Sequence, residues 1–349
     1  MIVQKSILSQ KISKLKNVVP KKPTISALQG VLVKEGYLIA NNLEMTVKAK
    51  LEGMEDETFI IPMKAFDLIG NLPDGDVEVI AAAGTITIKA EKIKNTYQTM
   101  DPDMFPINEI KNEDKAEISI KSEVFLESMK HVSYAISSLP GQNIMSALCL
   151  QARGGILNFV GLDGHVLAWD RVEYDGEFEL LIPKNTVDRL LSIGLIGEVS
   201  IRHNELGAVF ATEDYEISTR LIDGEYYKYQ NMFKDMPSNT SVVRSELLDA
   251  MVRAKMCIEE RKPVRFEFTG DVLNVSINDN TTEYHETVNL HESLEDDLTI
   301  GFDVRLVVDT LKAFDCEVVR LHLASPKMPM IVEAEDSMLK AIILPVMIG

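Results

Sequence analysis

The chain has 349 residues, of which 46% are hydrophobic and 26% charged, a balance typical of globular proteins with more than one domain. The sequence lacks a run of roughly 18 apolar residues and a signal-peptide pattern, so we expect a cytoplasmic protein without a membrane partner. Three scattered cysteines, Cys149, Cys257 and Cys316, form no CxxC pair, which argues against a disulfide framework or a cysteine zinc site.

Charge is distributed unevenly along the chain. The formal net charge is −18, which argues against a protein that simply coats DNA, because phosphate contacts need Lys and Arg. The N-terminal segment is nevertheless basic and holds no Asp or Glu before residue 23; its lysines are Lys5, Lys11, Lys14, Lys16, Lys21 and Lys22. Two interpretations stay open, a basic binding surface and an ordinary solvated helix face.

The first predicted helix follows this basic start. Apolar residues recur there at i, i+4, i+7 and i+11, the spacing of one helical stripe: Leu8, Ile12, Leu15 and Val19. Ser6 stands before the stripe, where an N-cap is expected. A strand is predicted at Leu38, a second helix over residues 64–72 after Ile61-Pro62, and alternating strands from Val77 onward.

The same order of elements recurs twice more. Further stripes are Phe125, Met129, Val132 and Ile136, and then Leu247, Met251, Ala254 and Ile258, with Ser122 and Ser245 as expected N-caps. Second helices are predicted over residues 185–193 and 304–314. The copies begin about 120 residues apart, which is too long for a solenoid repeat and fits whole domains.

Three domains of one kind follow from this period. Polar segments at residues 108–117 and 235–241 are the candidate linkers, so we predict domains over 1–113, 114–239 and 240–349. The predicted fold class is α+β, with helices on one face of curved antiparallel sheets. Strand edges of neighbouring units would pair, and a consistently curved chain of like units either closes or grows indefinitely.

Short motifs spread over the whole chain resemble one known family, the bacterial DNA polymerase III beta subunit or beta sliding clamp. They occur in the family's order as KPT (residues 22–24), NNLEM (41–45), IPMKAF (61–66), NLPDG (71–75), DMFP (103–106), LDGHVLA (162–168), IPK (182–184), LIDG (221–224), IGFDV (300–304) and IILPV (342–346). Each motif is weak alone. Their order and the threefold period make the resemblance specific.

The resemblance implies a DNA sliding clamp: two three-domain chains close head to tail as a homodimeric ring around duplex DNA. In the cytoplasm, at the nucleoid, such a ring holds the replicative polymerase to its template as a processivity factor, without catalysis, cofactor or metal. It implies DNA contacts at Lys22 and Lys184 and dimer contacts at Tyr97 and Met256. Asn143 and Ile144 depart from aromatic residues found in some members.

The resemblance also implies an apolar pocket that takes linear peptides of polymerases and of the clamp loader. The implied pocket residues are Met145, Leu162, Gly164, His165, Val166, Leu167, Tyr227, Met232, Ile342, Ile343, Leu344, Pro345, Val346 and Met347. Leu162, Val166 and Met347 replace polar or basic residues of better-known members, so we expect a preference for hydrophobic peptide anchors. The apolar C-terminal segment is also consistent with a last strand that only completes its domain.

Two other functions are considered. An enzyme would use Asp163, His165 and Asp170 for acid–base chemistry, but Asp163-Gly164-His165 is typical of a turn between strands, and no catalytic motif occurs. The other alternative is a mobile-element or accessory clamp-fold protein that binds partner peptides without encircling DNA.

Overall fold

The computed structural model describes residues 1–82, 84–107, 118–139, 144–258, 263–278, 282–294 and 296–348. The predicted linker at 108–117 and the departure at Asn143 lie outside these residues. Contacts divide the chain into two compact units: Met1–Leu126 with Asp188–Leu221, and Glu127–Val187 with Ile222–Gly349. No helix of the described residues is long and apolar enough to cross a membrane.

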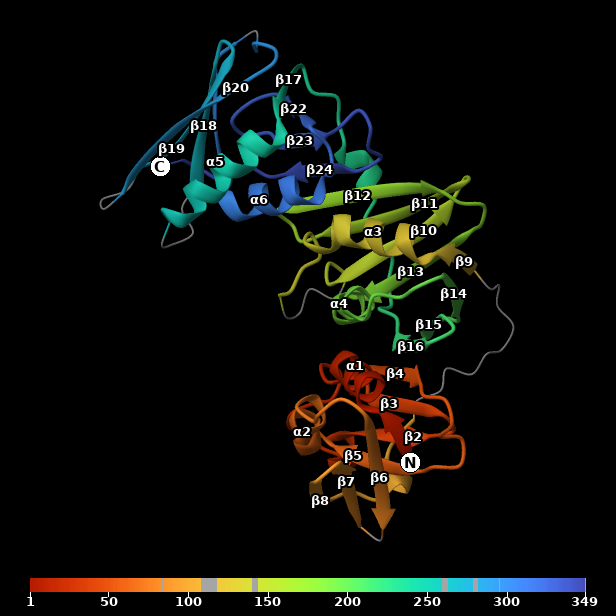
Figure 1. Ribbon diagram of the computed structural model, residues 1–349. Coiled ribbons are helices and arrows are strands. Elements are labelled where there is room, and N and C mark those ends of the chain that lie inside the picture. The colour runs from red at the N-terminus through yellow and green to blue at the C-terminus, as the bar shows by residue number, and fades with distance from the viewer. Residues whose placement is uncertain are drawn as a thin grey trace. The chain divides into compact units, whose positions relative to one another are not determined.

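The first unit contains two antiparallel sheets (Figure 1). Its four-stranded sheet has the order β1-β6-β7-β8, and its eight-stranded sheet the order β5-β2-β3-β4-β16-β15-β14-β9. The strands are β1 (Ile2–Gln4), β2 (Gly30–Lys34), β3 (Tyr37–Asn41), β4 (Met45–Lys50), β5 (Phe59–Pro62), β6 (Asp76–Ala82), β7 (Thr85–Ala90), β8 (Ile93–Gln98), β9 (Ile118–Lys121), β14 (Glu198–His203), β15 (Gly207–Ala211) and β16 (Tyr215–Arg220).

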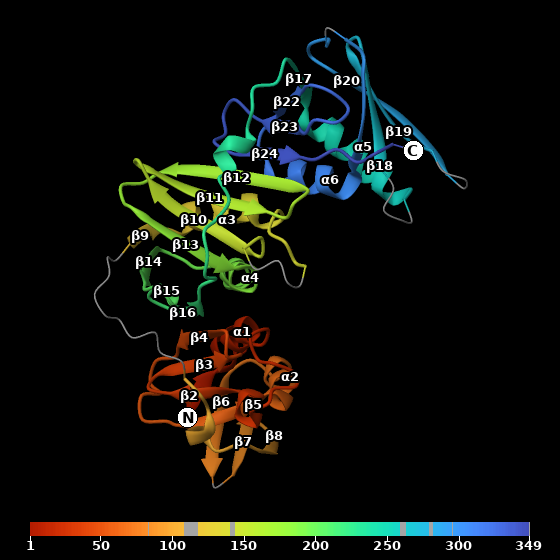
Figure 2. The same ribbon diagram turned by 180° about the vertical axis from the view of Figure 1, so that it is seen from behind.

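The second unit repeats this plan, as Figure 2 shows from behind. Its sheets have the orders β13-β10-β11-β12-β24-β23-β22-β17 and β20-β19-β18-β21. The strands are β10 (Ala147–Arg153), β11 (Ile156–Leu162), β12 (Val166–Glu173), β13 (Phe178–Pro183), β17 (Ser238–Val243), β18 (Pro263–Thr269), β19 (Val272–Asn278), β20 (Glu283–Asn289), β21 (Leu298–Asp303), β22 (Val318–Leu323), β23 (Met330–Glu333) and β24 (Lys340–Ile343).

The helices occur where the apolar stripes predicted them, but each domain's first helix ends before the last residue of its stripe, Val19, Ile136 and Ile258. They are α1 (Lys5–Leu15), α2 (Phe66–Gly70), α3 (Ser122–Ser133), α4 (Lys184–Ile193), α5 (Arg244–Met256) and α6 (Val304–Ala313), with short 3-10 turns at η1 (Ser26–Leu28), η2 (Met63–Ala65), η3 (Pro102–Met104) and η4 (Tyr229–Met232). Leu8, Ile12 and Leu15 of α1 are buried, as the stripe requires. The helix predicted over 64–72 is η2 followed by the short α2.

The predicted serine N-caps are wrong: Ser6 and Ser245 lie inside their helices, and Ser122 is the first helical residue of α3. Each first helix instead follows its strand directly, with the extended residues Gln4 and Val243 as N-caps of α1 and α5. A backbone carbonyl of a neighbouring segment accepts the first helical N–H and does the work of a cap. The three bonds are equivalent: Lys5 N to Gly75 O (2.9 Å), Ser122 N to Gly197 O (2.8 Å) and Arg244 N to Glu317 O (2.8 Å).

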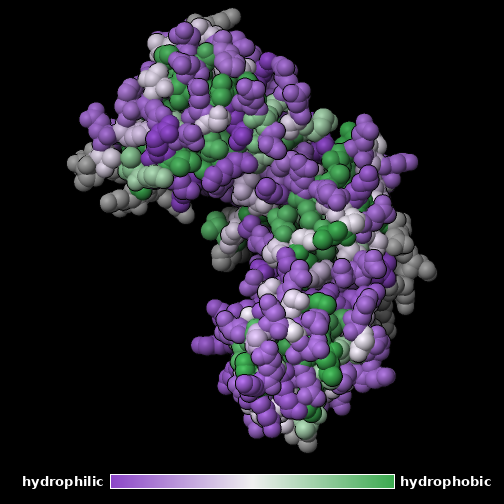
Figure 3. All heavy atoms as spheres, in the orientation of Figure 1, coloured by the Kyte–Doolittle hydropathy of each residue, from purple (hydrophilic) through white to green (hydrophobic). Residues whose placement is uncertain are grey.

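The polar surface and the apolar interior are separated as expected for a water-exposed protein. Hydrophilic side chains dominate the face shown in Figure 3.

In the second unit, α3 packs so tightly on β11 that only glycine fits at position 161. A Cβ atom there would meet the Val132 carbonyl oxygen at 2.5 Å.

We predict that Gly161→Ala destabilises the second unit, because the helix backbone must move away from the sheet. The expected cost is about 1–3 kcal/mol of unfolding free energy, typical of overpacking. Thermal unfolding followed by circular dichroism measures it. Gly70→Ala is the control, because its Cβ atom would meet only Ser9 Oγ at 4.0 Å. An unchanged unfolding midpoint for Gly161→Ala would contradict the close packing.

Candidate functional site

An apolar cavity of about 270 Å³ lies in the second unit, where β11, β12 and β24 meet. The structure brings ten of the predicted pocket residues together in its lining: Met145, Leu162, Gly164, His165, Val166, Leu167, Tyr227, Met232, Ile342 and Leu344. Tyr227, Met232 and Leu344 are each about two-fifths exposed and form the accessible rim. Leu162 and Val166 are buried, so two of the three departures toward apolar residues lie in the wall, whereas Met347 is 83% exposed and lies outside the lining.

The turn between β11 and β12 is held by one carboxylate. Asp163 Oδ1 accepts hydrogen bonds from the backbone N–H groups of His165 (2.8 Å) and Val166 (2.9 Å). Gly164 has φ +87°, a conformation that favours glycine. The His165 carbonyl then accepts the N–H of Leu344 (2.8 Å), which fixes the C-terminal segment against the turn.

The acidic residues of the enzyme alternative serve other partners. Asp163 closes its turn, and Asp170 Oδ2 lies 2.8 Å from His131 Nδ1 while Asp170 Oδ1 accepts the Arg171 N–H. Among the residues that the structure describes, no group of three His, Cys, Asp or Glu side chains is arranged to hold a metal ion.

Strand alternation decides which C-terminal residues reach the cavity. Ile342 and Leu344 line it, whereas Ile343 lies between them, is fully buried and is absent from the lining. Pro345, Val346 and Met347 also lie outside it. The chain continues beside β21, where Val346 N donates to Gly301 O (2.8 Å). The last strand therefore both completes the eight-stranded sheet and lines the cavity.

A buried aromatic cluster packs behind the cavity wall. Leu162, Leu167 and Ile342 share a buried cluster with Tyr226 and Tyr229. Trp169 packs edge-on against Tyr229, with ring centroids 5.2 Å apart. Burial raises the pKa of both tyrosine hydroxyls, so they stay protonated and donate, Tyr226 to Val160 O and Tyr229 to Gln151 Oε1 (3.1 Å).

Sequence reasoning missed Pro329, which also lines the cavity. Pro329 precedes β23, and the pairing of Met330 with Ile343 brings it to this edge of the cavity. No sequence pattern marks it, because only the register of β23 on β24 places it there.

The two predicted DNA contacts lie in different units. Lys22 is exposed in the segment between α1 and η1. Lys184 begins α4, and its Nζ donates to the Ser133 carbonyl (3.2 Å).

The basic N-terminal segment is partly neutralised within the first unit. Lys5, Lys11 and Lys16 pair with Asp74 (3.4 Å), Asp214 (3.4 Å) and Asp67 (2.9 Å), respectively. Lys14 donates to the Ser192 carbonyl (3.0 Å). The helices as a group are still basic: the six described α-helices hold eleven Lys and Arg against seven Asp and Glu, whereas the whole chain has 36 against 54.

The predicted dimer residues lie at or near open sheet edges. Tyr97 is half-buried on β8, an outer strand of its four-stranded sheet. Met256 ends α5 and is 79% exposed; α5 packs against β20, the outer strand of the other four-stranded sheet.

Comparisons with known proteins agree with this architecture. Residues 234–347 match the family model of the DNA polymerase III beta subunit, C-terminal domain. The beta sliding clamp of Rickettsia bellii is 22% identical over 96% of both chains. A putative DNA polymerase III beta subunit from Eubacterium rectale superimposes with a TM-score of 0.90 at 24% identity, over 99% of this chain and 98% of that one. A Pseudomonas aeruginosa sliding clamp bound to griselimycin superimposes with a TM-score of 0.91 at 22% identity, over 100% and 99%.

The chain therefore has the fold of the beta sliding clamps. More particularly, it is similar to bacterial DNA polymerase III beta subunits along nearly its whole length, in agreement with the resemblance that its sequence motifs indicated.

Proposed function

We propose that this protein is a DNA sliding clamp. Two copies close a ring around duplex DNA, and the ring tethers the replicative polymerase and other DNA enzymes so that synthesis is processive. The protein acts without catalysis, in the cytoplasm at the nucleoid. The observation that carries the proposal is that two of the four sheets have four strands each, half as many as the other two.

Each eight-stranded sheet consists of two four-stranded halves. One joins β5-β2-β3-β4 to β16-β15-β14-β9 through the pair β4 and β16; the other joins β13-β10-β11-β12 to β24-β23-β22-β17 through β12 and β24. Each four-stranded sheet corresponds to one such half without a partner half. The order β21-β18-β19-β20 matches the first half, and β8-β7-β6-β1 matches the second. By this repetition, β20 of one copy pairs with β8 of another.

A second copy satisfies both open edges at once. Exposed sheet edges are aggregation liabilities that proteins pair or cover, and a repeated head-to-tail contact closes only if the rotation allows it. Two copies supply two further eight-stranded sheets of the observed order. Tyr97 on β8 and Met256 beside β20 belong to this interface. The three equivalently capped first helices support the division into domains 1–113, 114–239 and 240–349.

The apolar cavity is the docking site for linear peptides of the polymerase and the clamp loader. Apolar walls with a few polar groups and an adaptable methionine at the rim suit peptide anchors. The P. aeruginosa relative is itself described as bound to a ligand, griselimycin. The side chains of Lys22, Lys184 and the basic helices contact the phosphate backbone of DNA. This attraction is independent of sequence and therefore permits sliding.

One observation favours the alternative of an accessory clamp-fold protein that does not encircle DNA. Three lysines of the N-terminal segment are paired with aspartates, which weakens their attraction to phosphate. The following experiments separate the two functions.

Light scattering across a dilution series tests ring closure. We expect a mass twice that of the 39.0 kDa chain. Tyr97→Asp should shift the protein toward the monomer, because it places a charge in the paired edge. Ile2→Asp is the matched control, since Ile2 is 63% exposed on β1, at the opposite edge of the same sheet. A monomer at every concentration would remove the ring and favour the accessory protein.

DNA encirclement is tested by the double variant Lys22→Glu and Lys184→Glu. We expect the double variant to lose processive synthesis. The salt dependence of its DNA-binding constant should also be weaker, by an amount that corresponds to about two lost phosphate contacts. Peptide binding should be unchanged. Lys327→Glu, an exposed lysine elsewhere in the second unit, is the control. Full processivity of the double variant would show that these lysines do not contact DNA.

Peptide docking is tested by Met232→Glu, which places a charge on the cavity rim. Calorimetric titration with a hydrophobically anchored clamp-binding peptide should show affinity reduced by about tenfold or more. Met338→Glu is the control, because Met338 is exposed in the same unit outside the lining. The wild-type protein should bind this peptide more tightly than a standard clamp-binding peptide; equal affinities would refute the shifted preference.

A further inference from the structure

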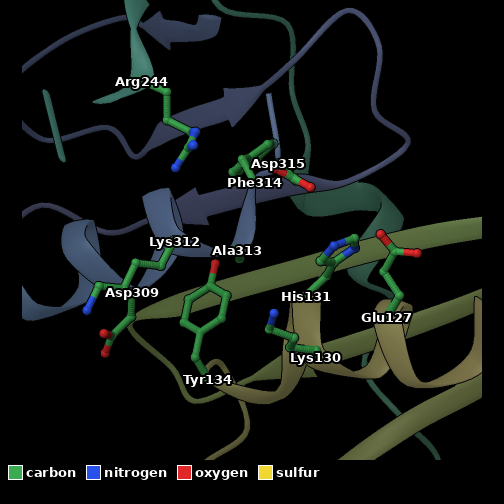
Figure 4. Close-up of a pocket in the computed structure, with 10 residues that line it drawn as sticks. All are labelled: Glu127, Lys130, His131, Tyr134, Arg244, Asp309, Lys312, Ala313, Phe314 and Asp315. Atoms are coloured by element: carbon green, nitrogen blue, oxygen red, sulfur yellow. The ribbon is translucent and has the colours of Figure 1, made fainter. Parts of the chain in front are cut away.

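A second and larger cavity, of about 470 Å³, lies between α3 and α6 of the second unit (Figure 4). It is separate from the peptide pocket. Gly161 of β11 faces α3, whereas the next residue, Leu162, points to the opposite face and lines the pocket. None of the peptide-pocket residues, neither of the named DNA contacts Lys22 and Lys184, and neither of the dimer residues lines this larger cavity, although its three cations belong to the helices counted above as basic.

Cationic side chains reach it from three different helices: Lys130 from α3, Lys312 from α6 and Arg244 from the start of α5. Within the described parts of the chain, none of the three forms an ion pair with a carboxylate. The Arg244 guanidinium is held in place by two backbone carbonyls: Nε donates to Cys316 O (2.7 Å) and Nη1 to Leu311 O (3.4 Å). A guanidinium fixed in this way is preorganised for an anion.

Acidic side chains line the same cavity, so its charge is balanced. Glu127 lies on α3, one turn before Lys130, and Asp309 and Asp315 lie on and just after α6. A bare anion would gain little here, because the carboxylates repel it while the cations attract it. A ligand that carries both an anionic group and hydrogen-bond donors satisfies both sets of side chains.

One aromatic ring projects into the cavity. It belongs to Tyr134, which follows α3, whereas Phe314 is almost completely buried and contributes little surface (Figure 4). Burial raises the pKa of the Tyr134 hydroxyl, so the ring stays neutral. An aromatic ring among charged groups suits a ligand with a planar ring, and the cavity volume is within the range of small-molecule sites.

We infer that this cavity binds a nucleotide. The phosphate meets the cationic side chains of Lys130, Lys312 and Arg244, the sugar hydroxyls and base amino groups donate to the carboxylates, and the base lies against the Tyr134 ring. The phosphate ester has two sources, a free nucleotide or an unpaired nucleotide of a DNA strand.

Calorimetric titration of the full chain with deoxyadenosine monophosphate, deoxyadenosine, inorganic phosphate and a short single-stranded oligonucleotide tests the inference. We expect the nucleotide or the oligonucleotide to bind more tightly than phosphate or nucleoside alone. The double variant Lys130→Gln and Lys312→Gln should weaken that binding by about tenfold or more, as expected for lost charge-assisted hydrogen bonds. Lys327→Gln should leave it unchanged.

Each outcome of the titration either supports or overturns the nucleotide site. Binding of the free nucleotide identifies a free ligand as the source, and binding of the oligonucleotide alone identifies DNA. Equal affinity for inorganic phosphate, equal affinity of the double variant, or no binding of either probe would overturn the site. The result does not depend on ring closure, because Tyr97→Asp, expected to be monomeric, should bind the nucleotide as the unmodified chain does.

Discussion

Backbone pairing at sheet edges is the constraint on which the rest of this structure depends. Each repeat brings strands whose N–H and C=O groups must find partners, and two eight-stranded sheets form because β4 meets β16 and β12 meets β24. The same rule leaves β8 and β20 open within one chain. The proposed assembly with a second copy would continue a pairing that the chain already makes twice.

One of these strand pairs also builds the apolar cavity. Pairing of β12 with β24 aligns Leu167 with Ile342, so that residues far apart in the sequence share one wall. Asp163 closes the turn that ends this wall, and the His165 carbonyl holds Leu344 beside it. Because the support consists of backbone bonds and buried aromatic rings, the wall is rigid, while exposed Met232 and Leu344 can adapt at its rim.

Charge is organised on a different principle from the apolar core. The chain as a whole is strongly acidic, yet its α-helices are net basic, and pairs such as Lys11 with Asp214 moderate that excess. A sliding protein gains from such moderation, because every extra phosphate contact strengthens binding and deepens the salt dependence. The cavity between α3 and α6 shows the same balance on a smaller scale, with Lys130 and Lys312 beside Glu127 and Asp309.

The sequence by itself determined the helices, the threefold period and the resemblance to sliding clamps, because apolar spacing and short motifs are local signals. Most of the pocket residues were predictable from the resemblance. Only the tertiary structure decided that Ile342 lines the cavity while Ile343 does not, that Pro329 joins it, and that Gly75, Gly197 and Glu317 replace the expected serine caps. Those features depend on strand register and on contacts between distant segments, which no local pattern encodes.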